Sequence, residues 1–304
     1  MNKIKKLIQC ILCDHRFLKL VILTKFAWLL PDKLYLKLMF KLRMGYQLNI
    51  SNPQTFNEKL QWLKLYNRRP EYTCMVDKYE VKKYVADIIG EEYIIPTLGV
   101  WDRVDDIDFK SLPNQFVLKT THSGGNTGVV ICKDKNSFDI DACKKKLNKS
   151  LRQDVYRSLR EWPYKNVKRR IIAEVYKEDC NGELNDIKLF CFNGDPKAIL
   201  IATDRNTDVH FDYFDMDFNH LPFEQGGPNA IKPIKKPHNL ELLSVLASKL
   251  SKNIPHVRVD FYDVDGKIFF GELTFFDSSG FAIFNPQEWD YTFGGWIKLP
   301  EKHL

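Results

Sequence analysis

The fold class is decided by the segment VRVDFYDVDGKIFFGELT at residues 257–274, which alternates apolar with charged residues on both sides of a turn. Such alternation predicts two antiparallel strands. Asp263 and Gly266 occupy the first and fourth places of a type I turn closed by a left-handed glycine. We therefore expect a three-residue loop with a bulge, in which residue 263 faces residue 267. A two-residue loop would turn residue 272 to the opposite face.

In this register Arg258 lies opposite Glu272, with Asp260 diagonal to it on the same face. Diagonal neighbours are about 7–8 Å apart, so two carboxylates there can share one or two hard cations. An arginine beside them can stabilise a phosphoryl group in transfer. The alternative for these residues is a structural ion cluster.

A second stretch, residues 115–130, runs from a strand carrying Lys119 through a glycine-rich loop into another strand. Glycine lets the backbone approach a ligand closely and turn its N–H groups toward phosphate oxygens, and Lys119 would neutralise phosphate charge. This is not a Walker loop, because the loop leads to a strand and lacks Gly-Lys-Ser/Thr. Alone, such a loop is more often an ordinary hairpin turn than a phosphate-binding loop.

A third element joins the strand at residues 171–176 to Asp186 and Lys188 on the following strand. A strand that stops at Glu174 can offer its edge N–H and C=O groups to a purine. Asp186 and Lys188 fall on one face and suit ribose hydroxyls and phosphate, respectively. The alternative is a cross-strand ion pair on a solvated face.

Around these elements the sequence predicts helices up to about residue 90, then grouped strands. The helices are expected at 4–45, 56–65, 76–89 and 240–250, and the strands at 115–120, 128–132, 170–176, 186–192, 197–202, 209–217, 256–262 and 267–276. Strands grouped without strict βαβ alternation predict an α+β fold.

Positive charge is concentrated at the N-terminus. Residues 1–50 contain ten Lys or Arg and two Asp, which accounts for the chain's net charge of +7. A nucleic-acid binder would distribute basic residues differently, so we expect no nucleic-acid partner. The basic helices carry aromatic and leucine side chains, and two interpretations stay open: a lobe packed on the body, or docking on an anionic inner membrane surface.

The seven scattered cysteines favour a reducing cytoplasm, and the apolar stretch at residues 21–30 is too short to cross a bilayer. Residues 153–169 offer arginines and aromatics that could hold an acceptor, because arginine pairs with carboxylates and aromatics stack on sugars. These acceptor candidates are Arg157, Arg160, Trp162 and Tyr164. An ordinary solvated helix end is the competing interpretation.

Five sequence elements occur in the order seen in ATP-grasp ligases: Lys119 with its glycine loop, Ala-Glu-Val-Tyr, Asp-Ile-Lys, Arg-Val-Asp and Gly-Glu-Leu-Thr. More narrowly, the chain resembles the TupA-like ATP-grasp family over residues 36–300. The motifs that carry this resemblance are Phe56-Asn57-Glu58-Lys59-Leu60, Asp77-Lys78-Tyr79, Glu161-Trp162-Pro163-Tyr164-Lys165-Asn166 and Phe284-Asn285-Pro286. That family is associated with bacterial surface-polysaccharide and teichuronopeptide synthesis.

The resemblance implies an ATP-grasp fold, in which two α+β lobes clamp ATP behind a helical N-terminal region. It divides the chain into a basic region at 1–75 and a catalytic domain at 76–304, with a glycine-loop lobe at about 115–170, a hinge at 171–176 and a metal-binding lobe at 186–300.

The resemblance also implies the cofactors ATP and one or two Mg²⁺ ions, with roles for individual residues. The phosphates would be held by Lys119 and Lys188, and the acyl phosphate by Arg258. The lid would consist of Ser123, Gly124, Gly125, Asn126, Thr127 and Gly128. Adenine would contact Glu174, Val175 and Tyr176, the ribose would contact Asp186, and Mg²⁺ would be bound by Asp260, Glu272 and Thr274. ATP-grasp ligases usually carry asparagine where this chain has Thr274.

The implied activity is ATP-dependent amide formation between an amino acid and a uronic acid or amino sugar of a polysaccharide precursor, through an acyl phosphate. The expected location is the cytoplasm, with peripheral contact at the inner face of the membrane as the open alternative for the basic helices. One rival is a glycosyltransferase using Asp215-Met216-Asp217 as a metal-binding Asp-x-Asp. The other is a membrane-docked scaffold with a degenerate nucleotide site.

Overall fold

The computed structural model describes residues 15–125, 127–178, 185–203 and 209–301. Its α-helices are α2 His15–Lys25, α3 Asp32–Met44, α4 Phe56–Tyr66, α5 Glu71–Val76, α6 Glu80–Ile89, α7 Ile140–Leu151, α8 Val155–Leu159, α9 Leu240–Ser251 and α10 Glu288–Trp296. Its short 3-10 helices are η1 Ala27–Leu29, η2 Glu91–Tyr93, η3 Val104–Asp106, η4 Lys135–Ser137, η5 Trp162–Asn166 and η6 Asp277–Gly280. Its strands are β1 Thr97–Trp101, β2 Phe116–Thr120, β3 Val129–Cys132, β4 Ile171–Val175, β5 Asn185–Phe192, β6 Asp195–Thr203, β7 His210–Phe214, β8 His256–Val264 and β9 Lys267–Thr274.

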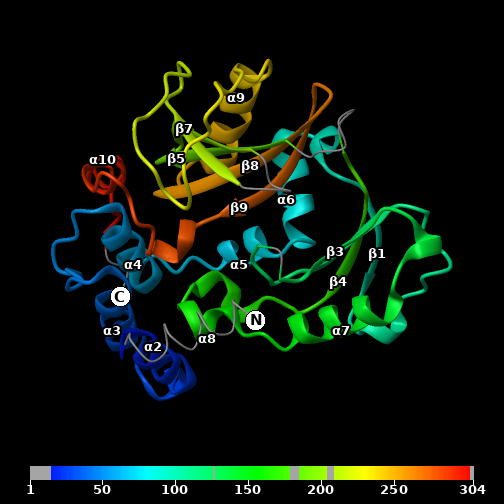
Figure 1. Cartoon of the computed structure of the whole chain (residues 1–304), viewed down its shortest axis with the longest axis horizontal. Coiled ribbons are helices and arrows are strands. Elements are labelled where there is room, and N and C mark those ends of the chain that lie inside the picture. The colour runs from blue at the N-terminus through cyan, green and yellow to red at the C-terminus, as the bar shows by residue number, and fades with distance from the viewer. Residues whose placement is uncertain (1–14, 126, 179–184, 204–208, 302–304) are drawn as a thin grey trace.

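The strands form two antiparallel sheets. The smaller has the order β1-β4-β2-β3 and the larger the order β7-β6-β5-β8-β9. Figure 1 shows them as separate layers, with α5 and α6 between them. The predicted α+β class is confirmed. Strand β1 was not expected, because its sequence Thr-Leu-Gly-Val-Trp is short and lacks alternation.

The decisive hairpin forms, but the expected register is wrong. Val264 faces Lys267, and the turn is a two-residue Asp265-Gly266 loop with φ of +51° and +84°, the geometry that Asp-Gly favours in hairpins. The bulge lies further from the turn, where the register shifts between Asp260 and Phe261 and leaves Gly271 unpaired. This extra residue returns Glu272 to the face that an unbroken two-residue hairpin would have denied it.

The larger sheet is covered on one face by α9, which buries Leu243, Leu246 and Leu250 at its apolar spacing of three and four. Helix α9 contacts β5, β6 and β8. Nearby, Phe56 of α4 packs edge-on against Phe192 and Phe293. Helices α4 and α10 pack together beside this aromatic cluster (Figure 1).

The motif at residues 56–60 ties α4 to the C-terminal segment. Asn57 donates to the carbonyl of Ala282 and accepts from its N–H, both at 2.8 Å. Lys59 donates to the carbonyls of Gly294 and Ile297, and Glu58 completes a capping box with Thr55. These residues therefore hold the backbone of the C-terminal segment in place.

The helix expected at 76–89 is α6, which begins only at Glu80; it is preceded by the unpredicted α5 and a break at residues 77–79. Asp77 causes the break, because its carboxylate accepts from the N–H groups of Tyr79 and Glu80 and so starts α6 anew. Its other oxygen accepts from Arg170, 2.9 Å away. The break places Lys78 between the two sheets.

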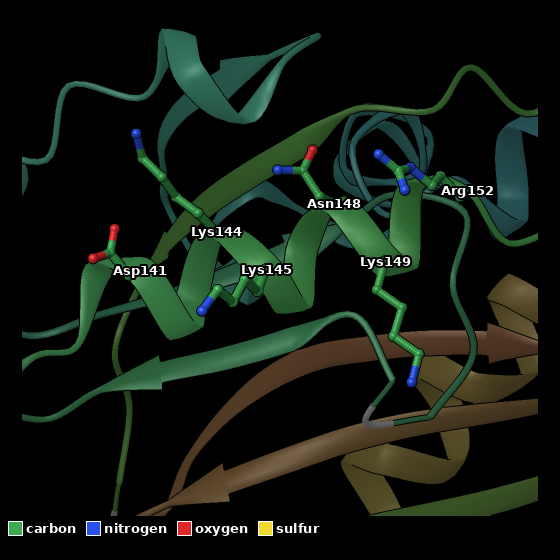
Figure 2. Close-up of a pocket in the computed structure, with 6 residues that line it drawn as sticks. All are labelled: Asp141, Lys144, Lys145, Asn148, Lys149 and Arg152. Carbon is green, nitrogen blue, oxygen red and sulfur yellow. The ribbon is translucent and has the colours of Figure 1, made fainter.

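Helix α7 lies against β2 and β3. Its outer side carries Lys144, Lys145, Lys149 and Arg152 around a surface depression (Figure 2). All lining residues come from this one helix and its C-terminal cap, so the depression is a solvated basic surface and not a built site.

The N-terminal residues that the structure describes form α2, η1 and α3. Buried Tyr35, Leu36, Met39 and Phe40 join α3 to the core. Other apolar side chains of these helices stay exposed, notably Phe26, Trp28 and Leu29. In the part of the chain that the structure describes, no helix combines the length and apolarity needed to span a bilayer.

Candidate functional site

Asp260 of β8 and Glu272 of β9 pair directly across the two strands. Arg258, two residues before Asp260, faces Thr274 and therefore points to the same side. Its guanidinium binds both carboxylate oxygens of Asp260, at 2.7 and 2.8 Å, and lies 3.6 Å from Glu272. The expected convergence of these three side chains on one face is present, although Arg258 is not the residue opposite Glu272.

Asp260 is the buried member of the carboxylate pair, with 2% of its side chain exposed. Besides Arg258 it contacts Lys188 of β5 at 2.5 Å, and Lys188 also contacts Asp186 at 2.6 Å. Strand β5 pairs with β8 so that residue 188 faces residue 260. The sequence-predicted Asp186 and Lys188 thus join the same cluster.

Glu272 has 35% of its side chain exposed and is the accessible member of the pair. Lys78 lies 3.3 Å from it, and the Thr274 hydroxyl donates to it at 3.2 Å. Burial tends to raise the pKa of Glu272, but Lys78, Arg258 and Lys188 outweigh burial and lower the pKa to about 2. Glu272 is therefore a carboxylate at any physiological pH.

Asp277 is a member of the cluster that sequence reasoning missed. It lies in η6, beyond the hairpin, and its carboxylate forms an ion pair with Arg258. Gln225 donates to its other oxygen at 3.0 Å. Asp260 and Asp277 together raise the pKa of Arg258 well above its ordinary value, against the opposing effect of burial.

On the smaller sheet, Lys119 of β2 and Glu174 of β4 form an ion pair of 2.6 Å. Lys82 of α6 contacts the other oxygen of Glu174 at 2.5 Å. Burial raises the pKa of Glu174, but the two lysines lower it by more, so that the net shift is downward. Lys82 also escaped the sequence analysis, since nothing in its helix marks it as different from a solvated lysine.

The glycine-rich loop has a fixed base and an exposed tip. Thr120 donates to Ser123 at 2.7 Å and shares a hydroxyl contact with Ser150 of α7. A Cβ on Gly128 would lie 2.0 Å from the Thr120 hydroxyl, so this base admits only glycine. Gly124, Gly125 and Thr127 are exposed at the tip, and Asn126 lies outside the described residues.

Two expected contacts with ATP need correction. Ser123 is buried and its hydroxyl also donates to the carbonyl of Thr120, so it builds the base of the loop and is not free for phosphate. Strand β4 is not an edge strand, because β1 and β2 flank it and the N–H of Val175 donates to Pro96. Within 174–176, Tyr176 alone lies beyond the strand.

The two sheets face each other across these charges. The N–H of Lys78 donates to the carbonyl of Thr121 at the start of the glycine loop, while its ammonium reaches Glu272 on the larger sheet. Burial lowers the pKa of Lys119, but Glu174 and, from the larger sheet, Tyr262 and Glu272 raise it by more. The clusters of Lys119 and of Arg258 therefore line one polar region between the sheets.

The predicted acceptor residues separate into different environments. Arg160 is buried, contacts Asp32 at 2.9 Å and donates to the carbonyls of Ala27 and Leu30, so it anchors the N-terminal helices and is not available to an acceptor. Arg157 is exposed on α8, and Trp162 is half-buried at the start of η5. Tyr164 lines a cavity beside the glycine loop.

The Asp-x-Asp at residues 215–217 has a structural role. Asp215 accepts from the N–H groups of Asp217 and Asn219 and from the side chain of Asn219. Its carboxylate therefore closes the turn after β7. The residue pattern on which the glycosyltransferase alternative depended is a turn.

The donors at the hairpin fit Mg²⁺. This ion prefers oxygen ligands and usually takes one or two carboxylates, with phosphates and waters completing its shell. Asp260 and Glu272 supply two carboxylates side by side and Thr274 a hydroxyl. Among the described residues no group of three or more His, Cys, Asp or Glu suits a metal.

Two facing antiparallel sheets, a lysine on one and an Arg-x-Asp strand beside a glutamate on the other, define an ATP-grasp fold. The chain belongs to the TupA-like ATP-grasp family, whose profile matches residues 58–298. The recognised family is confirmed, and membership supports the ATP-grasp ligase class expected from the sequence.

Solved structures give weaker likenesses. D-alanine–D-alanine ligase from Bacillus anthracis is 17% identical, with 66% of this chain and 57% of that chain covered and a TM-score of 0.38. The enzyme of the same name from Helicobacter pylori is 15% identical, with 80% and 69% covered and a TM-score of 0.43. The ATP-grasp ligase PsnB with minimal precursor, Mg and ADP is 13% identical, with 72% and 57% covered and a TM-score of 0.39.

The match thus spans little more than half the length of the Bacillus anthracis and PsnB structures. No curated protein matches the chain.

Proposed function

We propose that this protein is an ATP- and Mg²⁺-dependent ligase that joins a carboxylate to an amine through an acyl phosphate. The observation that carries the proposal is the convergence of Arg258, Asp260, Glu272 and Lys188 on one face of the larger sheet, opposite Lys119. Phosphoryl transfer needs charge neutralisation and positioning more than a covalent nucleophile. This arrangement supplies both.

In this proposal Lys119 and Lys188 bind phosphate oxygens of ATP, and the exposed tip of the glycine loop covers them. Tyr176 lies next to adenine and Asp186 next to the ribose. Mg²⁺, held by Asp260 and Glu272 with Thr274, neutralises charge on the phosphates when it is bound. Arg258 positions the substrate carboxylate for attack on the γ-phosphate and stabilises the acyl phosphate that forms.

A ligand must displace some of the present ion pairs. Asp260 now contacts Arg258 and Lys188, and Glu174 contacts Lys119. Phosphates can replace Asp260 and Glu174 as partners of the lysines, and Mg²⁺ can replace the cations on Asp260. This exchange keeps each buried charge compensated, which burial requires.

The finer substrates follow from the family's association with surface polysaccharides. We propose that one partner is an amino acid and the other a uronic acid or amino sugar of a polysaccharide precursor, in the cytoplasm. The domain division at residues 75 and 76 and the hinge at 171–176 belong to the same proposal.

The test is release of ADP by the full chain with MgATP, screened over amino acids crossed with uronates and amino sugars. Hydroxylamine added with a carboxylate traps an acyl phosphate as a hydroxamate, independently of the natural amine. We expect both hydroxamate and ADP to form only when the carboxylate is present. ADP release that no carboxylate stimulates, or stronger thermal protection by a nucleotide sugar than by MgATP, would contradict the ligase.

We further propose that the N-terminal helices dock on an anionic membrane surface. Trp28, Leu29 and Phe26 are 61%, 56% and 46% exposed, and exposed Lys25 and Lys33 accompany them. Each lysine near such a surface contributes about 1 kcal/mol. We expect the protein to co-sediment with vesicles that contain phosphatidylglycerol and not with vesicles of phosphatidylcholine alone. A Trp28→Ser, Leu29→Ser double variant should co-sediment less. Equal sedimentation with both vesicle types would refute docking.

A further inference from the structure

A cavity of about 510 Å³ lies between the tip of the glycine loop and the segment that runs from α8 into η5. Gly124 and Thr127 line it from the loop, and Glu161 and Tyr164 line it from the other side. The remaining described lining residues are Gln153, Asp154, Val155, Ser158 and Leu159. Two separate segments of the glycine-loop lobe therefore build this cavity, unlike the basic depression on α7.

The charge of the cavity is acidic. Asp154 and Glu161 contribute carboxylates, and the described part of the lining contains no lysine or arginine. Asp154 is used to cap α8, since it accepts from the N–H of Arg157 at 2.8 Å. Glu161 is 9% exposed. The Ser279 side chain hydrogen-bonds to its carboxylate and the charge of Lys64 acts on it. A carboxylate has about four acceptor sites, so Glu161 can accept further hydrogen bonds from a ligand.

A buried lysine lies behind Glu161 without entering the cavity. The ammonium of Lys64 donates to the carbonyls of Leu159 and Ser279 and to the Ser279 hydroxyl, at 2.8 to 2.9 Å. All three of its hydrogens are therefore committed. Lys64 can offer electrostatic support to Glu161, but it has no donor left for a ligand's carboxylate.

The cavity adjoins the phosphoryl-transfer cluster. Ser279, whose side chain hydrogen-bonds to Glu161, lies in η6 two residues after Asp277, and the carboxylate of Asp277 forms an ion pair with Arg258. A molecule held by Glu161 is thus next to the place where Arg258 would hold an acyl phosphate.

We propose that this cavity binds the amine co-substrate, that Glu161 binds its ammonium group, and that the amine belongs to a molecule without a carboxylate of its own, such as an amino sugar. This inference rests on the proposed ligase function. An α-amino acid bound here as the amine would bring a carboxylate next to Asp154 and Glu161 with no cation in the described lining to meet it. The amino acid therefore supplies the activated carboxyl group at Arg258.

The chemistry balances without a further reactant. Glu161 accepts one proton from the ammonium, and the nitrogen lone pair then attacks the acyl carbon. The N–C bond forms, the C–O bond to phosphate breaks with its electron pair on the phosphate, and the second proton from nitrogen goes to the departing phosphate.

The experiment compares binding of three probes to the full chain in the presence of MgADP, by saturation-transfer NMR and calorimetry. Glucosamine has an ammonium and no carboxylate, N-acetylglucosamine has neither, and alanine has both. We expect glucosamine to bind at least about tenfold more tightly than the other two, as a charged hydrogen bond would provide. Equal binding of glucosamine and N-acetylglucosamine, or tighter binding of alanine, would overturn the inference.

Two variants make the test specific. Glu161→Gln should remove the preference for glucosamine, whereas the exposed-surface control Glu91→Gln should retain it. Ser158→Lys places a cation in the lining and should shift the preference toward alanine, which a purely structural role of this segment does not predict. An unchanged preference in both cavity variants would refute the site.

The proposed ligase function fails separately, through the absence of hydroxamate formation with every carboxylate. The amine site fails through the binding preferences alone.

Discussion

Asp260 and Glu272 face each other across β8 and β9 only because Gly271 is bulged out of the ladder between them. The Asp265-Gly266 turn by itself would place position 272 on the other side of the sheet. The one extra residue of the bulge turns position 272 back to the face that carries Asp260, and so brings Glu272 beside Arg258. A conformational detail of one glycine thus determines whether the two carboxylates share a face.

We expect Gly271→Ala to weaken this site. A Cβ at residue 271 would lie 3.0 Å from the carbonyl oxygen of Asp260 and 3.3 Å from the ring of Tyr262. Such crowding costs about 1–3 kcal/mol or shifts the bulge, and either result disturbs Glu272. Urea unfolding and thermal protection by MgATP measure the two effects. Gly295→Ala, where nothing lies within 4 Å, is the matched control; equal behaviour of the two variants would contradict the role of the bulge.

Asp260→Asn and Glu272→Gln should each reduce ATP turnover about 10²–10³-fold, as expected for loss of a group that stabilises phosphoryl-transfer charge. Thermal protection by MgATP should fall in parallel, while protection by ATP with EDTA should stay low throughout. Asp217→Asn changes an exposed aspartate of the turn after β7 and should leave both quantities at the wild-type level. Full MgATP protection in the Asp260→Asn, Glu272→Gln double variant would exclude this metal site.

Lys119→Met should lower stability by about 1–3 kcal/mol, because it leaves the buried carboxylate of Glu174 with one cation in place of two. Adding Glu174→Gln removes the uncompensated charge, so the double variant should regain most of its melting temperature. ATP turnover should stay low in both, since phosphate has lost its lysine. Recovery of turnover together with stability would show that Lys119 serves the fold alone.

The stability of the protein should fall as the pH decreases from about 6.5 to 4. His256 is buried, its Nδ1 lies 3.0 Å from the carbonyl of Cys191, and burial lowers its pKa to about 4. Below pH 6.5 the unfolded chain binds a proton that the folded chain refuses until about pH 4, so the folded state loses up to about 3 kcal/mol over this interval.

Urea unfolding at pH 7, 6, 5 and 4 measures this loss. His256→Gln should flatten the dependence, and His238→Gln, which changes an exposed histidine, should not. An identical slope in wild type and His256→Gln would assign the acid sensitivity to other groups.

Much of the site was predictable from the sequence because its elements are local. Alternation with a period of two places Arg258 and Asp260 on one face of β8, and Asp186 and Lys188 on one face of β5, whatever the strands pair with. The order of the motifs was enough to indicate the family. The strand positions were predicted to within a few residues for the same reason, with β1 as the exception.

Other residues of the site could not be predicted, because their positions depend on distant parts of the chain. Asp277 reaches Arg258 because α4 holds η6: Gln61 donates to the carbonyls of Ser279 and Gly280. Lys78 reaches Glu272 because Asp77 interrupts a helix that periodicity alone would have continued. Arg160 appears in a promising motif, yet it is bound to Asp32, 128 positions earlier in the numbering.

The sequence by itself determined which residues can share a strand face, where the glycine loop lies and to which family the chain belongs, since all of these depend on near neighbours. The tertiary structure alone decided the position of the bulge, the partners of each buried charge and the acidic lining of the cavity at Glu161. The physical reason is that a buried charge must find its counter-charge through packing between lobes, and no short-range periodicity encodes that choice.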